Sequence, residues 1–334
     1  MHTHVIASSL RLRLLFSAVF LLLLLCACGQ TTTGGSTTSS APTPQPTALD
    51  AYGKPIVFPK TAPQRIVSLT PGNSETLAAL NLESRIVGVD YYTNYPASLT
   101  KLPKVSDVNG TFNVEKIASL KPDLVLSYGE ETKQYDTQLQ QLGLDVVDLP
   151  TVNFSQTLQQ IALVGRLTLT QNTANALVTQ LQQQVNQIKT TVAGTSTPSV
   201  LLEVDDSTPG KPYVFGGGSF GDEMLQDANA TNIFHTNMTN GGFPQVSDES
   251  IISANPQYVI LTEDPAYGGS ASAVYKRPNW GNIAAVKHHD VFHVNSDIVQ
   301  RPSPRLVEGL RCLAQTLHPD KFTGALPDYC SATV

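Results

Sequence analysis

One segment of this chain occurs twice, and this repeat restricts the possible folds more than any other feature does. Residues 113–127 read NVEKIASLKPDLVLS, and residues 247–261 read SDESIISANPQYVIL. Each copy has the pattern of a short helix, then a proline turn, then an apolar strand. Each also carries a glutamate, Glu115 or Glu249, in the first turn of its helix. A unit that recurs in both halves predicts two similar lobes, each presenting one carboxylate at an equivalent place.

Strand and helix patterns alternate through both halves of the chain. In the first half we expect strands at 65–69, 85–89, 124–127 and 145–149, and helices at 74–80 and 135–142. In the second half we expect strands at 200–204, 213–215, 258–262 and 291–294, and helices at 222–227, 279–286 and 303–317. Alternation of this kind predicts an α/β fold with two Rossmann-like lobes, each a parallel-type sheet covered by helices, and a ligand cleft between the lobes.

A long helix pattern separates the two halves. Its apolar residues recur every three or four positions, as one face of a helix requires, at Leu177, Leu181, Val185, Ile188 and Val192. About 22 residues of helix would be ~33 Å long. We therefore expect an N-terminal lobe over residues 50–170, a single inter-lobe helix over 171–194 and a C-terminal lobe over 195–334. One stiff connecting helix would limit closure of the cleft.

The N-terminus has the pattern of an export signal. Arg11 and Arg13 precede an apolar run, Leu14–Leu25, that is short for a bilayer span. The run ends in Leu-Cys-Ala-Cys, which resembles a bacterial lipobox and predicts that residues 1–27 are removed and that Cys28 is lipidated. Cys26 fits less well because a leucine precedes it. The alternative is an ordinary secretory signal with two incidental cysteines.

Residues 28–49 have the composition of a disordered tether. Positions 29–47 are almost all Gly, Thr, Ser, Pro, Gln and Ala and carry no charge, so they cannot bury enough apolar surface to fold. The folded part is therefore expected close to the outer face of a membrane. Loss of the signal removes two of the 21 basic residues and none of the 27 acidic ones, and an acidic chain argues against a nucleic-acid partner.

Two cysteines remain in the folded part. Cys312 and Cys330 form an even pair outside the cytoplasm, which is consistent with a disulfide that pins the C-terminal tail to the last helix. The spacing fits two unpaired thiols equally well.

Five stretches carry a resemblance to a known family. They are RIVSLTPGNSETLAAL, RIVGVDYYTNYP, FNVEKIASLKPDLVLSYG, FPQVSDESIISANPQYVILT and RPSPRLVEGLRCLAQ, spread over residues 63–319. In order and spacing they resemble the ABC-importer substrate-binding proteins for vitamin B12 and iron siderophores, a class III family with a helical backbone. The vitamin B12-binding members are the most similar. The resemblance implies a lipid-anchored, monomeric extracytoplasmic protein with no chemistry or cofactor of its own.

The resemblance also implies partners. In this family one glutamate per lobe docks on arginines of the permease, which works with an ATPase, and the matching positions are Glu115 and Glu249. The alternative is that each glutamate only stabilises its helix, since an acid in the first turn is favoured by ~0.3–1 kcal/mol. Asn113 and Ser247 would cap the two helices.

The resemblance places a ligand in the cleft. The positions that match family pocket residues are Tyr92, Tyr128, Phe243, Asp297 and Arg301. Tyr128, Phe243 and Val108 stand where the vitamin B12-binding members have tryptophan. Fewer indoles leave a smaller apolar surface, which suits a corrinoid but also a siderophore or haem. We expect cobalamin first, a ferric siderophore second and haem third. Core packing is the alternative for each aromatic residue.

The disulfide expectation also depends on the resemblance. In the vitamin B12-binding members, the cysteine at position 312 pairs with a cysteine of the second lobe near position 228. This chain has Ala228 there, so the resemblance favours Cys330 as the partner of Cys312.

Three other functions are alternatives. Gly217–Gly221 fits the G-x-S-x-G pattern of a serine hydrolase with Ser219 as nucleophile, and Asp264 or Asp290 followed by His293 would complete a triad. A turn against the ligand, with helix N–H groups available to an anion, explains the same glycines. A site for bare metal ions needs ligands from both lobes, yet residues 50–170 contain no histidine. The third is a tethered adhesion or signalling module without a cleft ligand.

Overall fold

A computed structural model of the chain describes residues 48–150, 153–263 and 269–331. The predicted signal, Cys28, nearly all of the predicted tether, and Asp264 lie outside these residues. Within them, no helix combines the length and the apolar character that crossing a membrane requires.

The first lobe is built on a four-stranded parallel sheet. Its strands lie in the order β2-β1-β3-β4, with bounds β1 Ile66–Ser68, β2 Ile86–Val89, β3 Leu124–Ser127 and β4 Val146–Asp148. Its helices are α1 (Pro71–Ala79), α2 (Val114–Ser119) and α3 (Gly129–Gln141), with short 3-10 helices at Glu83–Arg85 and Ala97–Lys101. Because the connections leave β1 and β3 in opposite directions, a crevice opens at the carboxyl ends of these two strands.

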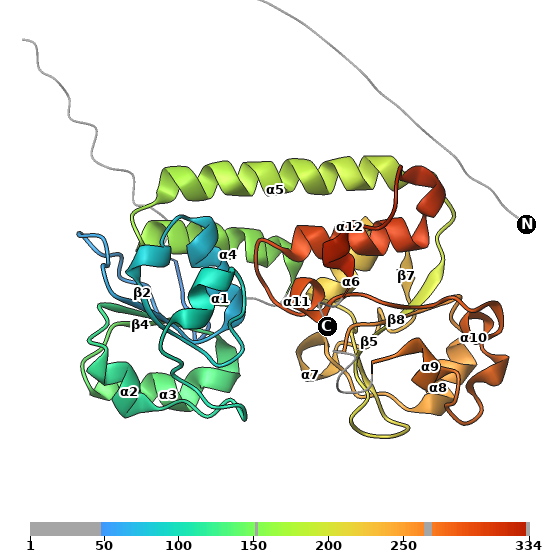
Figure 1. The fold of residues 1–334 in the computed structure, drawn as a ribbon, viewed down its shortest axis with the longest axis horizontal. Coiled ribbons are helices and arrows are strands. Elements are labelled where there is room, and N and C mark those ends of the chain that lie inside the picture. Colours follow the sequence, from blue (N-terminus) through green and yellow to red (C-terminus); the bar gives the residue numbers. More distant parts are fainter. Residues whose placement is uncertain (1–47, 151–152, 264–268, 332–334) are drawn as a thin grey trace, which may run out of the picture. The chain divides into compact units, whose positions relative to one another are not determined.

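The second lobe repeats this plan with one change. The strands lie in the order β6-β5-β8-β9, and β7 also pairs with β5. All pairings are parallel except that of β6 with β5. The strand bounds are β5 Ser199–Asp205, β6 Tyr213–Val214, β7 Thr231–Asn232, β8 Tyr258–Leu261 and β9 Val291–His293. The structure thus has the predicted α/β class, with two lobes built on parallel-type sheets (Figure 1).

Seven helices of this lobe are described. They are α6 (Phe220–Asp227), α7 (Thr239–Gly242), α8 (Asp248–Ala254), α9 (Ala271–Val274), α10 (Ala284–His288), α11 (Ser296–Val299) and α12 (Leu306–Leu317). Short 3-10 helices occupy Trp280–Asn282, Pro319–Lys321 and Asp328–Cys330. The single helix expected at 279–286 is divided, because Ile283 is extended between Trp280–Asn282 and α10.

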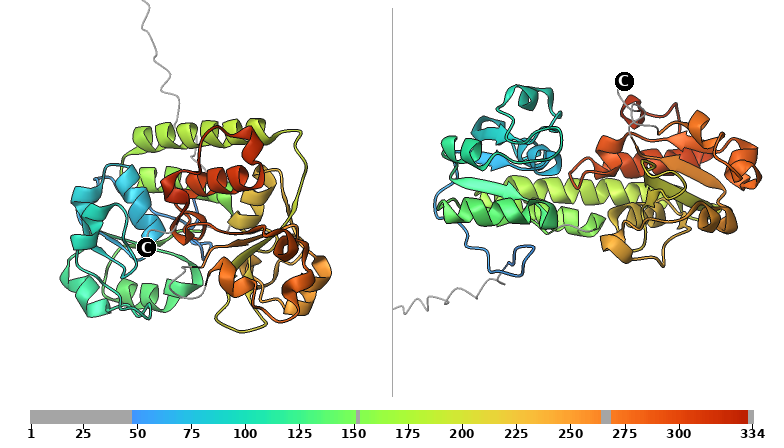
Figure 2. Two further views of the ribbon diagram at one scale, coloured as in Figure 1. Left: turned by 45° about the vertical axis from the view of Figure 1, so that its right-hand side comes forward. Right: turned by 90° about the horizontal axis from the view of Figure 1, so that it is seen from below.

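Two helices, α4 and α5, connect the lobes. The expected long helix is α5 (Gln171–Val192), and α4 (Phe154–Leu167), which we did not expect, runs beside it (Figure 2). The start of α4 contacts the second lobe, where the backbone N–H of Ser155 donates to Glu223 on α6 at 3.1 Å. Since α5 then returns to the second lobe, the expectation of a single connecting helix is incomplete.

The hydrophobic core explains why the lobes stay together. Along each central strand, alternate residues face different cores: Ile66 of β1 and Ile260 of β8 join one large core, while Val67 and Val259 join smaller ones. The large core also contains apolar residues of α4, α5 and α12, so it is continuous from one lobe to the other. The smaller cores lie under the outer helices of each lobe.

The repeated segment occupies equivalent places in the two sheets. Its copies form α2 with β3 and α8 with β8, and both strands are central in their sheets. The side chain of Asn113 accepts a hydrogen bond from the backbone of Lys116, and that of Ser247 accepts one from Ser250, which confirms the two expected caps.

Candidate functional site

A cavity of about 290 Å³ lies where the carboxyl ends of the central strands of both lobes meet. The first lobe contributes the loops after β1 and β3, and the second lobe contributes the end of β5 and residues of three later segments. The lining residues are Thr70, Pro71, Gly72, Tyr128, Val204, Phe220, Phe243, Gln300, Arg301 and Pro302. Three of the five predicted ligand-binding residues, Tyr128, Phe243 and Arg301, therefore share one cavity.

The second lobe supplies a rigid aromatic wall. The ring of Phe243 lies 5.5 Å from that of Phe220 and 5.3 Å from that of Phe215, measured between centroids. Phe215 is fully buried and supports the other two rings from behind. Such tilted and edge-to-face contacts fix the orientation of aromatic rings, so this wall is preformed for an apolar or flat ligand.

The glycine run before α6 packs under a loop instead of lining the cavity. A Cβ on Gly217 would lie 1.8 Å from the backbone oxygen of His235, so no larger residue fits there. The expectation that this turn lies against the ligand is wrong for Gly217, Gly218 and Ser219, none of which lines the cavity. The next residue, Phe220, does.

Ser219 gives the hydrolase alternative no support. Its side chain is fully buried, its hydroxyl donates to the carbonyl of Gly216 at 2.7 Å, and it accepts from the backbone of Asp222 as the cap of α6. His293, the proposed base, is hydrogen-bonded through Nε2 to the carbonyl of Glu263. A nucleophile needs a free, accessible oxygen, and the oxygen of Ser219 is neither free nor accessible.

Tyr92 does not line the cavity but lies next to it, because its backbone oxygen is 3.5 Å from Arg301, which does. Tyr92 is 49% exposed, and its ring is met edge-on by the ring of Tyr91. The Tyr92 hydroxyl donates to the backbone oxygen of Val108 at 2.5 Å. Tyr91, Tyr95 and Val108 are exposed to a similar degree, and we call these three residues and Tyr92 the rim, an exposed and mostly aromatic set in the first lobe.

A buried carboxyl pair supports the loop that carries Tyr128. Asp136 on α3 and Asp148 at the end of β4 are each 2% exposed, and the Tyr52 hydroxyl oxygen lies within hydrogen-bond distance of both, at 3.3 and 3.0 Å. Asp148 also accepts from the backbone N–H of Gly129 at 2.9 Å. Burial and, to a smaller extent, the neighbouring Asp148 raise the pKa of Asp136 to about 7, so Asp136 holds a proton up to near neutral pH.

Asp297 and Arg301 belong to a polar cluster that joins the lobes. Arg301 donates to Asp297 at 2.5 Å and to the side chain of Asn94 at 2.6 Å, and Asn94 donates to Asp297 at 2.9 Å. The second member from the first lobe is Glu75, which lies 3.3 Å from Arg301. Asp297 is close to Arg301 but does not line the cavity.

Glu75 and Asn94 are site residues that the sequence analysis missed. Glu75 is 3% exposed on α1, and burial raises its pKa while Ser303 and two arginines oppose that effect. The sequence does show the two sets of charges that pair. A lone acid lies within the apolar helix pattern at 74–80, and two arginines lie in the segment RPSPR at 301–305. Nothing in the sequence links these two segments, which lie more than 200 positions apart.

Glu115 and Glu249 are exposed, one in each lobe. Both lie in the first turns of their short helices, α2 and α8, which lie on the side of the fold away from α5 (Figure 1). The pKa of Glu249 is lowered by its own backbone N–H, by Ser247 and by Lys211. Two exposed acids at matched positions form a bivalent anionic surface.

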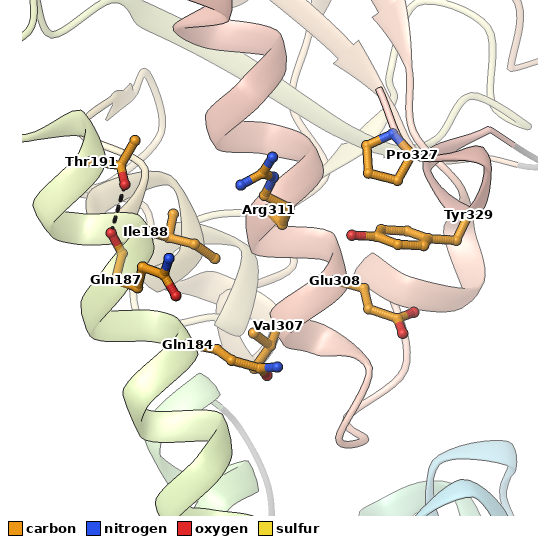
Figure 3. A pocket seen from close by; sticks show the side chains of 9 residues that line it. All are labelled: Gln184, Gln187, Ile188, Thr191, Val307, Glu308, Arg311, Pro327 and Tyr329. Atoms are coloured by element: carbon orange, nitrogen blue, oxygen red, sulfur yellow. Dashed lines mark hydrogen bonds between the residues drawn. The ribbon is translucent and has the colours of Figure 1, made fainter. Parts of the chain in front are cut away.

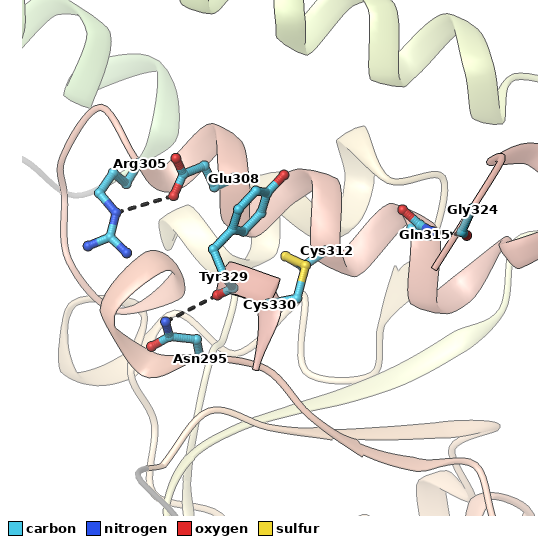
Figure 4. The surroundings of a disulfide bond; sticks show 8 residues. All are labelled: Asn295, Arg305, Glu308, Cys312, Gln315, Gly324, Tyr329 and Cys330. Atoms are coloured by element: carbon cyan, nitrogen blue, oxygen red, sulfur yellow. Dashed lines mark hydrogen bonds and ion pairs between the residues drawn. A yellow bond between two sulfur atoms is a disulfide. The ribbon is translucent and has the colours of Figure 1, made fainter. Parts of the chain in front are cut away.

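The structure contains a disulfide between Cys312 on α12 and Cys330, with the Cα atoms 5.6 Å apart (Figure 4). It holds the tail against α11. The backbone oxygen of Cys330 accepts from the N–H of Asn295 at 2.9 Å, and that of Tyr329 accepts from the Asn295 side chain at 3.2 Å. Asn295 in turn caps the backbone N–H of Asp297.

A second hollow, of about 240 Å³, lies between α5, α12 and the tail (Figure 3). Its lining includes Gln184, Gln187, Glu308, Arg311 and Tyr329 and contains none of the predicted site residues. It lacks the aromatic wall of the cavity between the lobes, so we place the candidate site in that cavity.

Comparisons with known proteins agree with this geometry. Residues 66–298 match the profile of the family described as periplasmic binding protein. The chain is 35% identical to the Bacillus subtilis protein YvrC, an uncharacterized ABC transporter substrate-binding lipoprotein, over 83% of this chain and 87% of that one. It is 28% identical to the vitamin B12-binding protein of Salmonella typhi, over 77% and 91% of the two chains.

Solved structures show the same fold. A possible iron-binding, periplasmic solute-binding protein from Staphylococcus epidermidis superposes with a TM-score of 0.68 at 30% identity, over 77% of this chain and all of that one. A periplasmic haem-binding protein from Pseudomonas aeruginosa superposes with a TM-score of 0.68 at 24% identity, over 79% and 96%. This second likeness concerns the fold alone.

Proposed function

The chain belongs to the periplasmic binding protein family, and from that premise we propose that it binds cobalamin or a related corrinoid and delivers it to an ABC importer. The coarser function, substrate binding for an ABC transporter, follows from the family and from the relative YvrC. The observation that carries the finer proposal is the cavity shared by the lobes, with a phenylalanine wall on one side and exposed tyrosines at its rim.

The size of the cavity fits a ligand that extends to the rim. About 290 Å³ is at the lower end for small-molecule sites, so a corrinoid would fill the cavity with one edge and lay a face against the rim. The rim offers Tyr91, Tyr92 and Tyr95, each roughly half exposed. The relatives named for vitamin B12 binding support this choice of ligand.

A titration tests the ligand. We expect cyanocobalamin to bind more tightly than haemin or a ferric siderophore, measured by isothermal calorimetry. Calorimetry is preferable to tryptophan fluorescence because Trp280 is fully buried against Arg277 in the second lobe and lies outside the cavity lining. Tighter binding of haemin or of a ferric siderophore would reject the corrinoid.

Tyr92 provides a second test. Removal of its ring in Tyr92→Ala should weaken cyanocobalamin binding about tenfold, because a stacked aromatic contact contributes roughly 0.5–1.5 kcal/mol beyond the area it buries. Tyr275→Ala is the matched control, since Tyr275 is also exposed but packs on His289 of the second lobe, whereas Tyr92 contacts the cavity residue Arg301. Unchanged affinity in Tyr92→Ala would remove Tyr92 from the ligand site.

An iron ligand is the second candidate. The Staphylococcus epidermidis structure, with 30% identity, is that of a possible iron-binding protein, and the tyrosines of the rim are chemically suited to iron. The titration with a ferric siderophore and haemin decides between this ligand class and a corrinoid.

We also propose that the protein is held at the outer face of the cell membrane by a lipid on Cys28. The relative YvrC is named a lipoprotein, which supports this proposal. Palmitate labelling of the cells should mark the wild-type protein and should be lost in Cys28→Ser, with the protein released into the soluble extracytoplasmic fraction. Labelling that persists in Cys28→Ser would reject this anchor.

A further inference from the structure

Glu75 is a buried acid on the helix whose start lines the cavity. It lies on α1, whose first residues and N-cap, Thr70–Gly72, line the cavity, and it is 3% exposed. A buried carboxylate is costly unless it is paired. The described partners of its side chain all come from one segment of the other lobe, residues 301–305.

The contacts show a carboxylate held on both oxygens. Ser303 donates to Oε2 at 2.7 Å, while Arg301 and Arg305 approach Oε1 at 3.3 and 3.4 Å. All three donors are themselves at most partly exposed, so water does not screen these contacts as it does on an open surface. Removal of Glu75 would leave two guanidinium groups without this acceptor.

The backbones of the two lobes also meet here. A Cβ added to Gly72 would lie 2.6 Å from the backbone oxygen of Pro302, so α1 and the 301–305 segment are in direct contact. The guanidinium group of Arg305 lies 4.1 Å from the ring centroid of Tyr95 in the first lobe. Glu75 is therefore the centre of a contact between α1, the rim and the second lobe.

The guanidinium group of Arg301 is surrounded by acceptors from the protein itself. It contacts Asp297, the side chain of Asn94, Glu75 and the backbone oxygen of Tyr92, at 2.5 to 3.5 Å. A guanidinium with this many acceptors serves better as a cross-link than as an open receptor for an anionic ligand.

We propose that Glu75 is a positioning residue that clamps the 301–305 segment of the second lobe onto α1 of the first, and that this clamp sets the width of the ligand cleft. The shared core of α4, α5 and α12 joins the lobes through apolar contacts, and the clamp joins them at the floor of the cleft. The part of the proposal that concerns ligand affinity rests on the proposed function; the part that concerns the width of the cleft does not.

The chain contains a matched control. Glu203 is 1% exposed and accepts two hydrogen bonds of 2.6 Å from Arg277, but both residues belong to the second lobe. Glu203→Gln therefore weakens a buried acid–arginine pair without touching the contact between the lobes.

The width of the cleft is measured by double electron–electron resonance on the ligand-free full chain. Spin labels are attached at Gln138→Cys on α3 and Lys287→Cys on α10, which are exposed and lie in different lobes, with Cys26 and Cys28 replaced by serine. In Glu75→Gln we expect the distance distribution to broaden or lengthen by about 2 Å or more, the size of a small packing shift between elements. In Glu203→Gln it should match that of the wild type.

A milder variant covers the case in which Glu75→Gln fails to fold. Ser303→Ala removes only the 2.7 Å bond to Glu75 and should change the distribution in the same direction by a smaller amount. A wild-type distribution in every Glu75 and Ser303 variant that folds overturns the clamp.

Cyanocobalamin affinity is the second readout. Glu75→Gln should weaken binding about tenfold, while Glu203→Gln should stay within about twofold of the wild type. Equal loss in the two variants would show a general effect of stability and overturn the positioning role. If the wild type does not bind cyanocobalamin, the corrinoid proposal fails. The clamp between Glu75 and the 301–305 segment is then tested by the spin-label distances alone.

Discussion

At the scale of single residues, buried carboxyl groups distinguish the functional region from the rest of the first lobe. Asp136 and Asp148 share the hydroxyl of Tyr52, and Ser127 donates to Asp136 at 2.8 Å. The other Asp136 oxygen, Oδ1, is buried without a hydrogen-bond partner, so an ionised Asp136 would leave a charged oxygen unsatisfied.

This pair predicts a pH-dependent stability. Burial raises the pKa of Asp136 from 3.8 to about 7, so between these values the folded chain holds a proton that the unfolded chain has lost. The contribution of Asp136 to the free energy of unfolding is therefore complete below about pH 4 and is lost as the pH rises through about 7. Asp136→Asn keeps a neutral side chain at every pH. At pH 8 its free energy of unfolding should therefore exceed that of the wild type by about 1–3 kcal/mol.

Urea unfolding at pH 5, 6, 7 and 8 measures this difference. The advantage of Asp136→Asn should grow with pH, and the exposed Asp320→Asn should show no such trend. A constant difference across the range would show that Asp136 does not gain a proton in the folded state.

The place of a residue in the cavity could be predicted from the sequence only where it depends on the neighbouring strand or helix. Tyr128 and Phe243 follow predicted strands or precede the repeated segment, and both line the cavity. Glu75 could not be assigned, because its role depends on contacts with Ser303 and Arg305, which a linear pattern does not connect. Tyr92 remains a predicted ligand residue placed at the rim.

At the scale of elements, the strands were predicted most closely and the connections least. Strand β3 spans the expected residues, since Leu124, Val125 and Leu126 form an uninterrupted buried apolar run before Ser127. Helix α4 was missed although Asn153 and Gln156 form a capping box that the sequence displays. Its buried face contains Thr157 and Gln160, which weakens the apolar period that marks a helix.

The last helix shows how a loop replaces an expected turn of helix. We expected a helix from residue 303, but α12 begins at Leu306. Pro302 and Pro304 disfavour helix in the residues before them, and Ser303 instead bonds to Glu75. The departure from helix thus coincides with the contact between the lobes.

The disulfide on α12 predicts a loss of stability when it is removed. It closes a loop of 18 residues, for which a chain-entropy argument gives about 3 kcal/mol. Cys312→Ser with Cys330→Ser should lower the free energy of unfolding by about this amount in urea. The wild type treated with a reductant should show a similar loss, and a change below about 1 kcal/mol in both would contradict the estimate.

At the scale of the whole folded unit, the two lobes are not independent. Two similar halves were predictable from the repeated segment, because each copy brings its own strand and helix. The shared core was not predictable. Leu202 of β5 and Leu126 of β3 belong to one cluster that also contains apolar residues of α4, α5 and α12. Burial of apolar surface between the halves therefore stabilises their arrangement in addition to each half.

The matched glutamates lead to a prediction about transport. Glu115→Arg with Glu249→Arg reverses both exposed charges and should reduce uptake of cyanocobalamin at least about tenfold in cells that contain the importer, because docking on basic permease residues would become repulsive. Calorimetry should give cyanocobalamin affinity within about twofold of the wild type, since neither residue lines the cavity.

Glu83→Arg with Asp320→Arg is the control for that variant. Both residues are exposed acids outside the repeated segment, and the net charge changes equally. Equal loss of uptake in the two double variants would point to net charge, and equal loss of affinity and uptake in the first would reject a docking role.

The N-terminal segment of the folded unit also has a mechanical meaning. The backbone N–H of Ala51 donates to the carbonyl of Asp148, and the Tyr52 hydroxyl reaches Gly129 at 3.0 Å, beside Tyr128 of the cavity. Tension on the chain before Ala48 would therefore load bonds that hold the loop of Tyr128. Pulling the chain from its N-terminus is therefore a direct way to load the ligand site.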